Sequence, residues 1–305
     1  MLLNKILNNR RQYGRNGNIV IPSPFESSWD ISTITDTSNR LAVTNPTGGT
    51  QPSTDGTKLF SASADTIKRA SLGANGSLFG ASWDSGQVLS CPELLQGFRF
   101  MADGLNIGIV HGTGTGYFKH GKLAVAWDLT TVTWGSDISI PRPSEGGTNV
   151  AYPKSVHIKP DLSKVWISGR GKLEWGEDMY TNTTTTANGL ITALNLQAAT
   201  AGTVERGTQQ SGFNVAKDGE QYFVTGGGGI YQAALNPVDD PASAYAVGWY
   251  EYPFEEPVPH GNAWEHTKAI ANITKAAINN DGRKCYVVKA PASNEIEEWE
   301  FAAAA

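Results

Sequence analysis

Five segments of the chain repeat one pattern of apolar and polar positions: a short strand, a turn containing Asp, a second apolar strand, a polar gap and a third strand. The turn aspartates are Asp55, Asp103, Asp161, Asp218 and Asp281. Gly follows all of them except Asp161, which Leu162 follows. Asp and Gly suit tight turns of type I′ and related types because Gly adopts positive φ and Asp accepts hydrogen bonds from nearby backbone N–H groups. The pattern predicts five similar antiparallel units.

The segments beside the turns alternate between apolar and polar residues, which is typical of half-buried strands. We predict strands entering the turns at 97–100, 155–158 and 212–215, strands leaving them at 58–61, 106–110, 164–168, 221–225 and 284–288, and third strands at 66–70, 116–119, 172–175, 229–233 and 295–299.

The spacing of the turns indicates the architecture. Successive turn aspartates are 48, 58, 57 and 63 residues apart, which fits four-stranded blades of ~40–50 residues with longer connections. Each blade has two apolar faces that only neighbouring blades can cover, so a ring is expected. The predicted fold is all-β: a single β-propeller over residues 19–305, with about five four-stranded antiparallel blades at 19–73, 74–124, 125–180, 181–237 and 238–301.

Two further expectations follow from a closed ring. The last strand, Glu295–Phe301, is expected to lie close to the strand near Ile19–Ile21, where the two could pair. A sixth, diverged blade would have to lie within 74–97 or 237–272.

Two heptads in the chain are closely alike and are expected at blade starts. They read Trp29-Asp30-Ile31-Ser32-Thr33-Ile34-Thr35 and Trp127-Asp128-Leu129-Thr130-Thr131-Val132-Thr133. Together with Thr54-Asp55-Gly56-Thr57-Lys58-Leu59-Phe60, the first heptad resembles the propeller repeats of bacteriophage virion proteins and their bacterial relatives, which read W-D-(I/V)-S-T … P-D-G-T-K-(M/L)-(F/Y)-V. The match is good in the first blade, fair in the third and elsewhere limited to the turn and the strand after it. The resemblance implies a non-enzymatic structural or adhesive part of a phage particle.

Composition and charge narrow the function classes. The chain has 34 Gly and 15 Pro, which favours short strands joined by tight turns. Its net charge of −5 and pI near 5.6 argue against a broad nucleic-acid interface. Residues 1–18 differ because they contain Lys5, Arg10, Arg11 and Arg15 and no acid. This arm is either a disordered basic terminus or an anchor that orders against an acidic partner surface.

We expect neither a signal peptide nor membrane insertion. The apolar start of the chain is too short for a signal peptide, and no stretch approaches the ~20 apolar residues that a membrane span needs. The expected location is a virion, assembled from protein made in the host cytoplasm.

The Cys, His and Gly residues of the chain do not form a pattern that is typical of a metal site or a phosphate-binding loop. Cys91 and Cys285 make neither a disulfide framework nor a metal cluster, and Cys285 is expected in the core. His111 and His120 flank one predicted hairpin and could meet across it, whereas a zinc site needs three or four ligands. His157 is expected within a strand, and His260 and His266 in an exposed Pro-rich loop. The Gly-rich run 111–116 lacks the Gly-Lys-Ser/Thr ending and joins two strands, so it predicts no phosphate loop.

Catalytic residues are not predicted either. The carboxylates Asp30, Asp128, Glu174 and Glu255 show no spacing that singles out an acid–base pair, and no Gly-x-Ser-x-Gly motif occurs. We therefore expect no enzyme, no cofactor and no metal, and keep a hydrolase of surface polysaccharide as the third hypothesis.

The aromatic residues leave a sugar-binding alternative open. Trp166, Trp175 and Trp299 fall at apolar strand positions and are expected in the core, whereas Trp134, Trp249 and Trp264 fall in connections and are candidates for stacking on a host glycan.

The leading hypothesis is a structural component of a bacteriophage virion, at the tail, collar or capsid surface. It would act through protein–protein contacts with other virion proteins, made in part by the N-terminal arm. The alternative is a carbohydrate-binding adhesin that recognises a host surface glycan.

Overall fold

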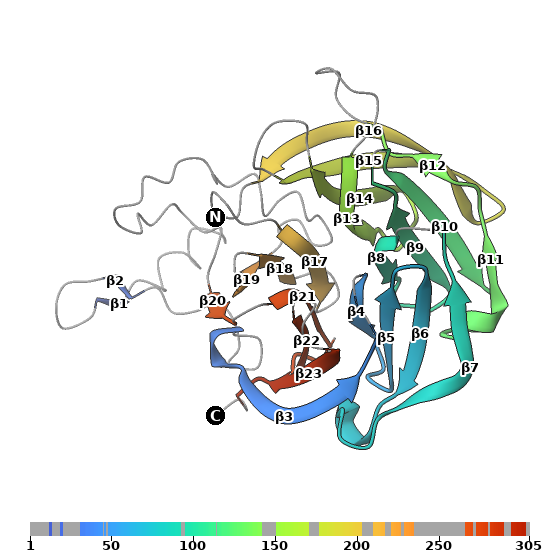
Figure 1. Cartoon of the computed structure of the whole chain (residues 1–305). Helices are drawn as coiled ribbons and strands as arrows, with labels where there is room; N and C mark the ends of the chain where they lie inside the picture. Colours follow the sequence, from blue (N-terminus) through green and yellow to red (C-terminus); the bar gives the residue numbers. More distant parts are fainter. Residues whose placement is uncertain are drawn as a thin grey trace.

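The computed structural model describes residues 12–13, 19–20, 31–44, 46, 48–92, 95–113, 115–141, 151–170, 177–202, 210–216, 221–226, 229–234, 266–270, 273–279, 281–289 and 294–302. This part of the chain is almost entirely β-structure, and all its strand pairs are antiparallel. The prediction of an all-β protein built from four-stranded antiparallel sheets is confirmed (Figure 1). No helix within the described ranges is long and apolar enough to cross a membrane.

Five sheets, here numbered I to V, make up the body of the molecule. Sheet I contains β4 (Gly49–Pro52), β5 (Lys58–Ser63), β6 (Thr66–Ser71) and β7 (Ser82–Ser90). Sheet II contains β8 (Leu95–Phe100), β9 (Asn106–His111), β10 (Tyr117–Leu123) and β11 (Val132–Trp134), and β12 (Ile138–Ser139) also pairs with β10. Sheet III contains β13 (Ala151–Ile158), β14 (Lys164–Arg170), β15 (Glu177–Ala187) and β16 (Leu190–Gly202).

The remaining sheets come from the C-terminal third and from both ends of the chain. Sheet IV contains β17 (Gln210–Ala216), β18 (Gln221–Gly226), β19 (Gly229–Ala234) and β20 (His266–Ala269). Sheet V contains β21 (Ile273–Ile278), β22 (Lys284–Lys289), β23 (Glu295–Glu300) and β3 (Thr35–Ala42). Short 3₁₀ turns occur at η2 (Ile31–Thr33), η3 (Ala74–Gly76) and η4 (Leu129–Thr131).

The first strands of the five sheets contact one another in a cycle. β4 lies against β8, β8 against β13, β13 against β17, β17 against β21, and β21 against β4. Figure 1 shows these five strands innermost, with the sheets extending outward from a common centre.

The sheets begin later in the chain than the expected blades at 19–73, 74–124, 125–180, 181–237 and 238–301. Each sheet starts with the strand that enters the Asp turn, so sheet I covers 49–90 and sheet II starts at 95. The Trp-Asp heptads do not open a sheet; they form η2 and η4, which precede β3 and β11, the outermost strands of sheets V and II. Residues 74–92 hold η3 and β7 of sheet I and no extra sheet, while 235–265 lie outside the described residues.

The second heptad has a structural role that explains its composition. The Trp127 ring stacks on Phe60 of sheet I at a centroid distance of 5.7 Å and lies 5.6 Å from the ring of Phe100. Asp128 caps η4 by accepting the Thr130 N–H. The heptad therefore joins two neighbouring sheets; Trp29 and Asp30 of the first heptad lie outside the described residues.

The C-terminal strand pairs with a different N-terminal strand from the one expected. The C-terminal strand β23 pairs with β3, with Glu300 opposite Thr35 and Glu295 opposite Ala42. The strand expected in that place, near Ile19–Ile21, forms β2 (Ile19–Val20) and pairs with β1 (Gln12–Tyr13) instead. β3 has the length to cover β23, whereas β2 has two residues.

The Asp turns are confirmed at four sites, with a different conformation from type I′. Only the residue after each Asp has positive φ: +68° at Gly56, Gly104 and Gly282, and +60° at Leu162. Each turn Asp accepts the backbone N–H two residues later, at 2.8–3.0 Å. The turn is thus four residues long with a left-handed last residue, which Leu162 adopts despite its side chain. Asp218 lies outside the described residues.

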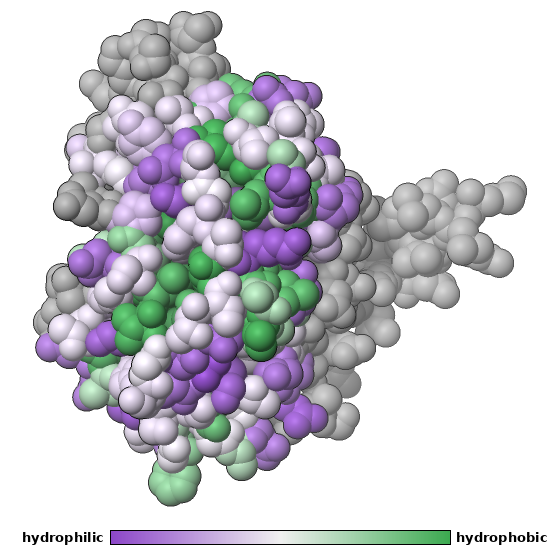
Figure 2. All heavy atoms as spheres, turned by 90° about the vertical axis from the view of Figure 1, so that its right-hand side faces the viewer, coloured by the Kyte–Doolittle hydropathy of each residue, from purple (hydrophilic) through white to green (hydrophobic). Residues whose placement is uncertain are grey.

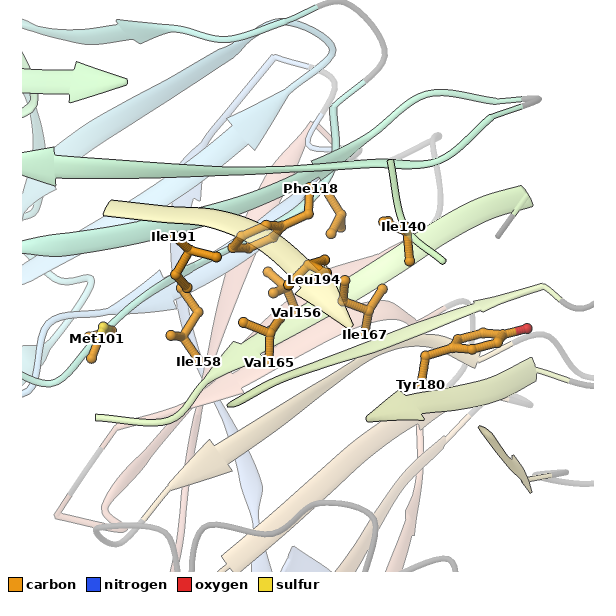
Figure 3. Packing of buried hydrophobic residues seen from close by; sticks show 11 residues of the cluster. Met101, Phe118, Ile140, Val156, Ile158, Val165, Ile167, Tyr180, Ile191 and Leu194 are labelled. Carbon is orange, nitrogen blue, oxygen red and sulfur yellow. The ribbon is translucent and has the colours of Figure 1, made fainter. Parts of the chain in front are cut away.

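The core is divided among the seams between neighbouring sheets. Figure 3 shows the seam of sheets II and III, where Phe118 and Ile191 meet Val156, Ile158 and Val165. Similar apolar clusters fill the seams between sheets I and II, IV and V, and V and I. Cys285 is fully buried in one of them, as expected, and neither cysteine forms a disulfide. Apolar packing between sheets therefore holds the repeated units together.

The outer edge of the molecule is more mixed. Figure 2 shows hydrophobic residues there as separate patches among hydrophilic ones. Large exposed apolar side chains in the described residues include Phe79, Val88 and Val125, but scattered exposed side chains of this kind are normal for a folded protein.

Candidate functional site

The centre of the molecule is crossed by one long side chain. Lys275 on β21 donates hydrogen bonds from its ammonium group to the backbone carbonyls of Gly48, Gln96 and Lys154. These residues lie at the inner ends of sheets I, II and III. An ammonium group has three N–H donors, so Lys275 joins sheet V to three other sheets through one atom.

The repeat explains why only one side chain can reach this position. Lys275 lies six residues before its turn Asp, and the matching residues in the other repeats are Gly49, Gly97, Ser155 and Gly212. A methyl group added to Gly49 would lie 2.6 Å from Lys275 Cδ, and one added to Gly97 would lie 2.4 Å from the Lys154 carbonyl oxygen. Gly49 therefore leaves room for the Lys275 side chain, and Gly97 allows the close approach of the Lys154 carbonyl.

The cavity beside Lys275 in the described part of the chain is small. The cavity lined by Gly49, Gly97, Ser155 and Lys275 measures about 30 Å³, which has room for roughly one or two water molecules. A substrate-sized pocket is absent from the described residues around Lys275.

A larger opening among the described residues is a groove between sheets V and I, with a volume of about 310 Å³. Its polar lining residues are Thr44, Ser61, Ser63, Lys68 and Asn294, and Trp83 lines it as well. The Trp83 indole N–H donates a 2.8 Å hydrogen bond to the Ala42 carbonyl, which fixes the ring across the seam.

The groove begins where the seam changes from apolar to polar residues. At its inner part Leu59 and Ala70 of sheet I pack against Leu41 and Ile296 of sheet V. The next residue on the same face of each strand, two positions closer to the groove, is Ser61 after Leu59, Lys68 before Ala70, Val43 after Leu41 and Asn294 before Ile296. Lys68 cannot be buried unpaired at low cost, so the sheets part here and leave its ammonium accessible.

The predicted meeting of His111 and His120 is wrong. His111 pairs with Tyr117 across β9 and β10, and its Nε2 lies 3.2 Å from Asp137. Burial lowers the pKa of His111, against the opposing effect of Asp137. His120 pairs with Gly108, three residues along β9 from His111. Because side chains alternate between the two faces of a sheet, the two imidazoles point to opposite faces.

His120 serves a structural purpose between sheets II and III. Its Nδ1 accepts the Ile191 N–H at 3.0 Å, and its buried Nε2 has no hydrogen-bond partner in the part of the chain that the structure describes. Burial lowers its pKa to about 4, so the ring is neutral near pH 7. A neutral imidazole with one accepting nitrogen is what the Ile191 N–H requires.

The face of sheet III that carries His157 and Trp166 is unusually polar. His157 lies within β13, as expected, with Trp166 and Thr181 in the same cross-strand row. Trp166 Nε1, Ser168 Oγ and Thr181 Oγ1 are buried and have no hydrogen-bond partner among the described residues.

The other sequence candidates have structural roles or lie outside the described residues. Trp166 is buried as predicted, and Trp299 packs against the core of sheets IV and V. Trp134 is not in a connection; it lies on β11 and packs against the core of sheets I and II. Asp128 accepts hydrogen bonds from Thr130 and Gln87. The candidates outside the described residues are Asp30, Glu174, Trp175, Trp249, Glu255, His260 and Trp264.

The Gly-rich run 111–116 joins two strands, as predicted, and a second Gly-rich connection does the same. Residues 112–116 link β9 to β10, and Gly226 at the end of β18 pairs with Gly229 at the start of β19. No group of three or more His, Cys, Asp or Glu that could hold a metal occurs in the described part of the chain.

Sequence reasoning missed both Lys275 and the groove. A signal for Lys275 was available, because it is the only long residue at a position that is otherwise Gly or Ser in the five aligned repeats. The groove residues gave a weaker signal, since Ser61 and Lys68 fit an ordinary solvent-facing strand pattern. Comparison with protein-family models and with curated proteins finds no match to this chain.

Proposed function

We propose that the chain is a single five-bladed β-propeller and serves as a non-enzymatic structural protein of a bacteriophage virion. The observation that carries the structural role is the Lys275 ammonium, bonded to carbonyls of three other sheets. Propeller enzymes need an open centre that admits substrate, and here the centre is occupied by the protein's own side chain.

The propeller proposal is supported by two further features. The inner strands contact each other in the order I–II–III–IV–V–I, and sheet V combines the last strand of the chain with β3 from its beginning. Pairing strands from both ends within one sheet closes a ring through backbone hydrogen bonds, which leaves few unpaired edges.

The virion setting rests on the repeat sequence. The Trp-Asp heptads and the Asp-Gly-Thr-Lys turn resemble the repeats of phage virion propellers, and Trp127 and Asp128 use the heptad to join blades. Partners in this proposal are other virion proteins, contacted in part by the basic arm of residues 1–18, which lies largely outside the described residues.

Mass spectrometry of purified virions tests the setting. Particles released by cells that carry the gene should contain the chain at a fixed ratio to the capsid protein, and a co-expressed non-structural phage protein serves as the negative control. Replacing Lys5, Arg10, Arg11 and Arg15 with Gln should lower incorporation. Particles without the chain would reject the proposal.

A further inference from the structure

We infer that the groove between sheets V and I binds a carboxylated sugar residue. The groove is a property of this seam, so the inference does not depend on the virion role and goes beyond it. Its volume of about 310 Å³ is at the lower end of the ~300–1,000 Å³ typical of small-molecule pockets, which suits one or two sugar units.

The charge of the groove selects an anion. Lys68 has no ion-pair or hydrogen-bond partner among the described residues, and none of the described lining residues is a carboxylate. Elsewhere in sheet I, Arg69 pairs with Asp84 at 2.6 Å. Lys68 is therefore a cation left available for a ligand, and a charge-assisted hydrogen bond to a carboxylate is the strongest contact it can make.

The other groove residues suit a sugar ring rather than a bare anion. Trp83 is held in place by its bond to the Ala42 carbonyl, so its indole offers a fixed apolar surface for the C–H face of a pyranose. Thr44 and Asn294 lie on the opposite wall and supply a hydroxyl and an amide for sugar hydroxyls. Phosphate or sulfate alone would use Lys68 and leave this aromatic surface unused.

The test compares an acidic oligosaccharide with its uncharged methyl ester. Digalacturonic acid and its methyl ester are titrated into the full chain by isothermal titration calorimetry at low and high salt. We expect the acid to bind at least ~10-fold more tightly than the ester, since one charge-assisted contact is worth about 1.4 kcal/mol or more. Added salt should reduce this difference.

Variants then place the ligand in the groove. Lys68→Gln should remove the preference for the acid, and Trp83→Leu should weaken acid and ester alike. Lys122→Gln is the matched control, because Lys122 is an exposed lysine on β10 of sheet II; it should leave both affinities unchanged. Thermal melts confirm that each variant is folded.

Several results would overturn the inference. Equal affinity of the wild type for acid and ester would show that the groove does not recognise the carboxylate. This comparison does not depend on the folding of any variant. An equal loss in Lys68→Gln and Lys122→Gln would show binding by overall charge. Absence of heat with either ligand at ~10 mM would exclude a useful site, leaving the proposed structural role untouched.

Discussion

The ammonium of Lys284 lies 2.7 Å from a carboxylate oxygen of Glu298, and both side chains are buried in sheet V. Glu298 also accepts hydrogen bonds from Asn39, the Ser77 hydroxyl and the Leu78 N–H. Ser77 and Leu78 belong to the connection between β6 and β7, so this carboxylate ties sheet V to sheet I. Despite burial, the hydrogen bonds with Lys284 and Leu78 hold the pKa of Glu298 below its ordinary value.

Glu298→Gln should lower the free energy of unfolding by about 3–5 kcal/mol, because breaking a buried pair leaves an uncompensated charge. The amide would also present N–H groups to donors that now face a carboxylate oxygen. Urea denaturation at pH 7 measures the change. Glu300→Gln is the control: Glu300 lies 3.3 Å from Lys284 but its side chain is half exposed, so about 1 kcal/mol or less is expected. Similar losses in the two variants would show that burial does not increase the contribution of Glu298 to the free energy of unfolding.

Stability should fall between pH 6.5 and 4 because of His120. The folded state holds this ring neutral down to about pH 4, whereas the unfolded chain protonates it near 6.5. Between these pH values the unfolded state binds more protons than the folded state. The contribution of His120 to the free energy of unfolding is therefore complete above pH 6.5, and about 3 kcal/mol of it is lost as the pH falls to 4. His120→Asn keeps an acceptor for Ile191 and should flatten this part of the pH profile measured by urea denaturation. A wild-type slope that persists in the variant would assign the effect to other groups.

The sequence indicates the strands of this fold better than their grouping. Alternating residues and Asp turns locate β5, β9, β14, β18 and β22 closely, because these patterns depend on local backbone geometry. The sheet boundaries were displaced because the Trp-Asp heptad marks a contact between sheets: Trp127 packs on Phe60 of the neighbouring sheet. Nothing in the local pattern distinguishes a residue that begins a sheet from one that joins two.

The candidate site depends on contacts between residues distant in sequence. Lys275 reaches Gln96, which is 179 residues away, and the groove joins Asn294 to Lys68. Local pattern cannot say which strand faces which. Trp134 escapes sequence analysis for a local reason: its strand β11 has three residues, too few for the alternation of apolar and polar residues to be visible.

Two glycines with the same φ separate backbone strain from crowding. Gly56 and Gly104 both have φ +68°; a methyl group on Gly56 meets nothing within 4 Å, whereas one on Gly104 would lie 2.3 Å from the Trp127 ring. Gly56→Ala should cost about 1 kcal/mol, from the left-handed conformation alone. Gly104→Ala should cost about 1–3 kcal/mol more, because the ring must shift. Chemical denaturation of both variants gives the comparison, and equal costs would mean that Trp127 is not held against the turn.

A double-mutant cycle tests whether Lys275 fills the centre. Lys275→Ala should cost about 3 kcal/mol, since it leaves three partly buried carbonyls without their donor. Gly49→Ala should be strongly destabilising in the wild type, because its methyl group would lie 2.6 Å from Lys275 Cδ, and at least ~1 kcal/mol less so once Lys275 is Ala. Gly56→Ala, far from Lys275, should be additive with Lys275→Ala. Additivity at Gly49 as well would mean that the lysine lies elsewhere.

A circular permutant tests closure of the ring. The Ala302 N–H donates to the Thr33 hydroxyl at 3.4 Å, just beyond the pairing of Glu300 with Thr35. A short linker from Ala302 to Ile31 would therefore turn β23 and β3 into an ordinary hairpin. New ends between Thr44 and Gly48 would interrupt no strand, because β3 ends at Ala42 and β4 begins at Gly49.

The reference for this permutant is the linear chain 31–302. If the ring is closed by β3, both chains have the same contacts and their melting temperatures should agree within about 5 °C. A linear chain that lacks 31–44 loses the partner strand of β23 and the cover that Leu41 gives to Ile296, so it should melt at a much lower temperature or fail to fold. A permutant as unstable as the truncated chain would mean that the order of the strands along the chain, and not the closed arrangement, holds sheet V to sheet I.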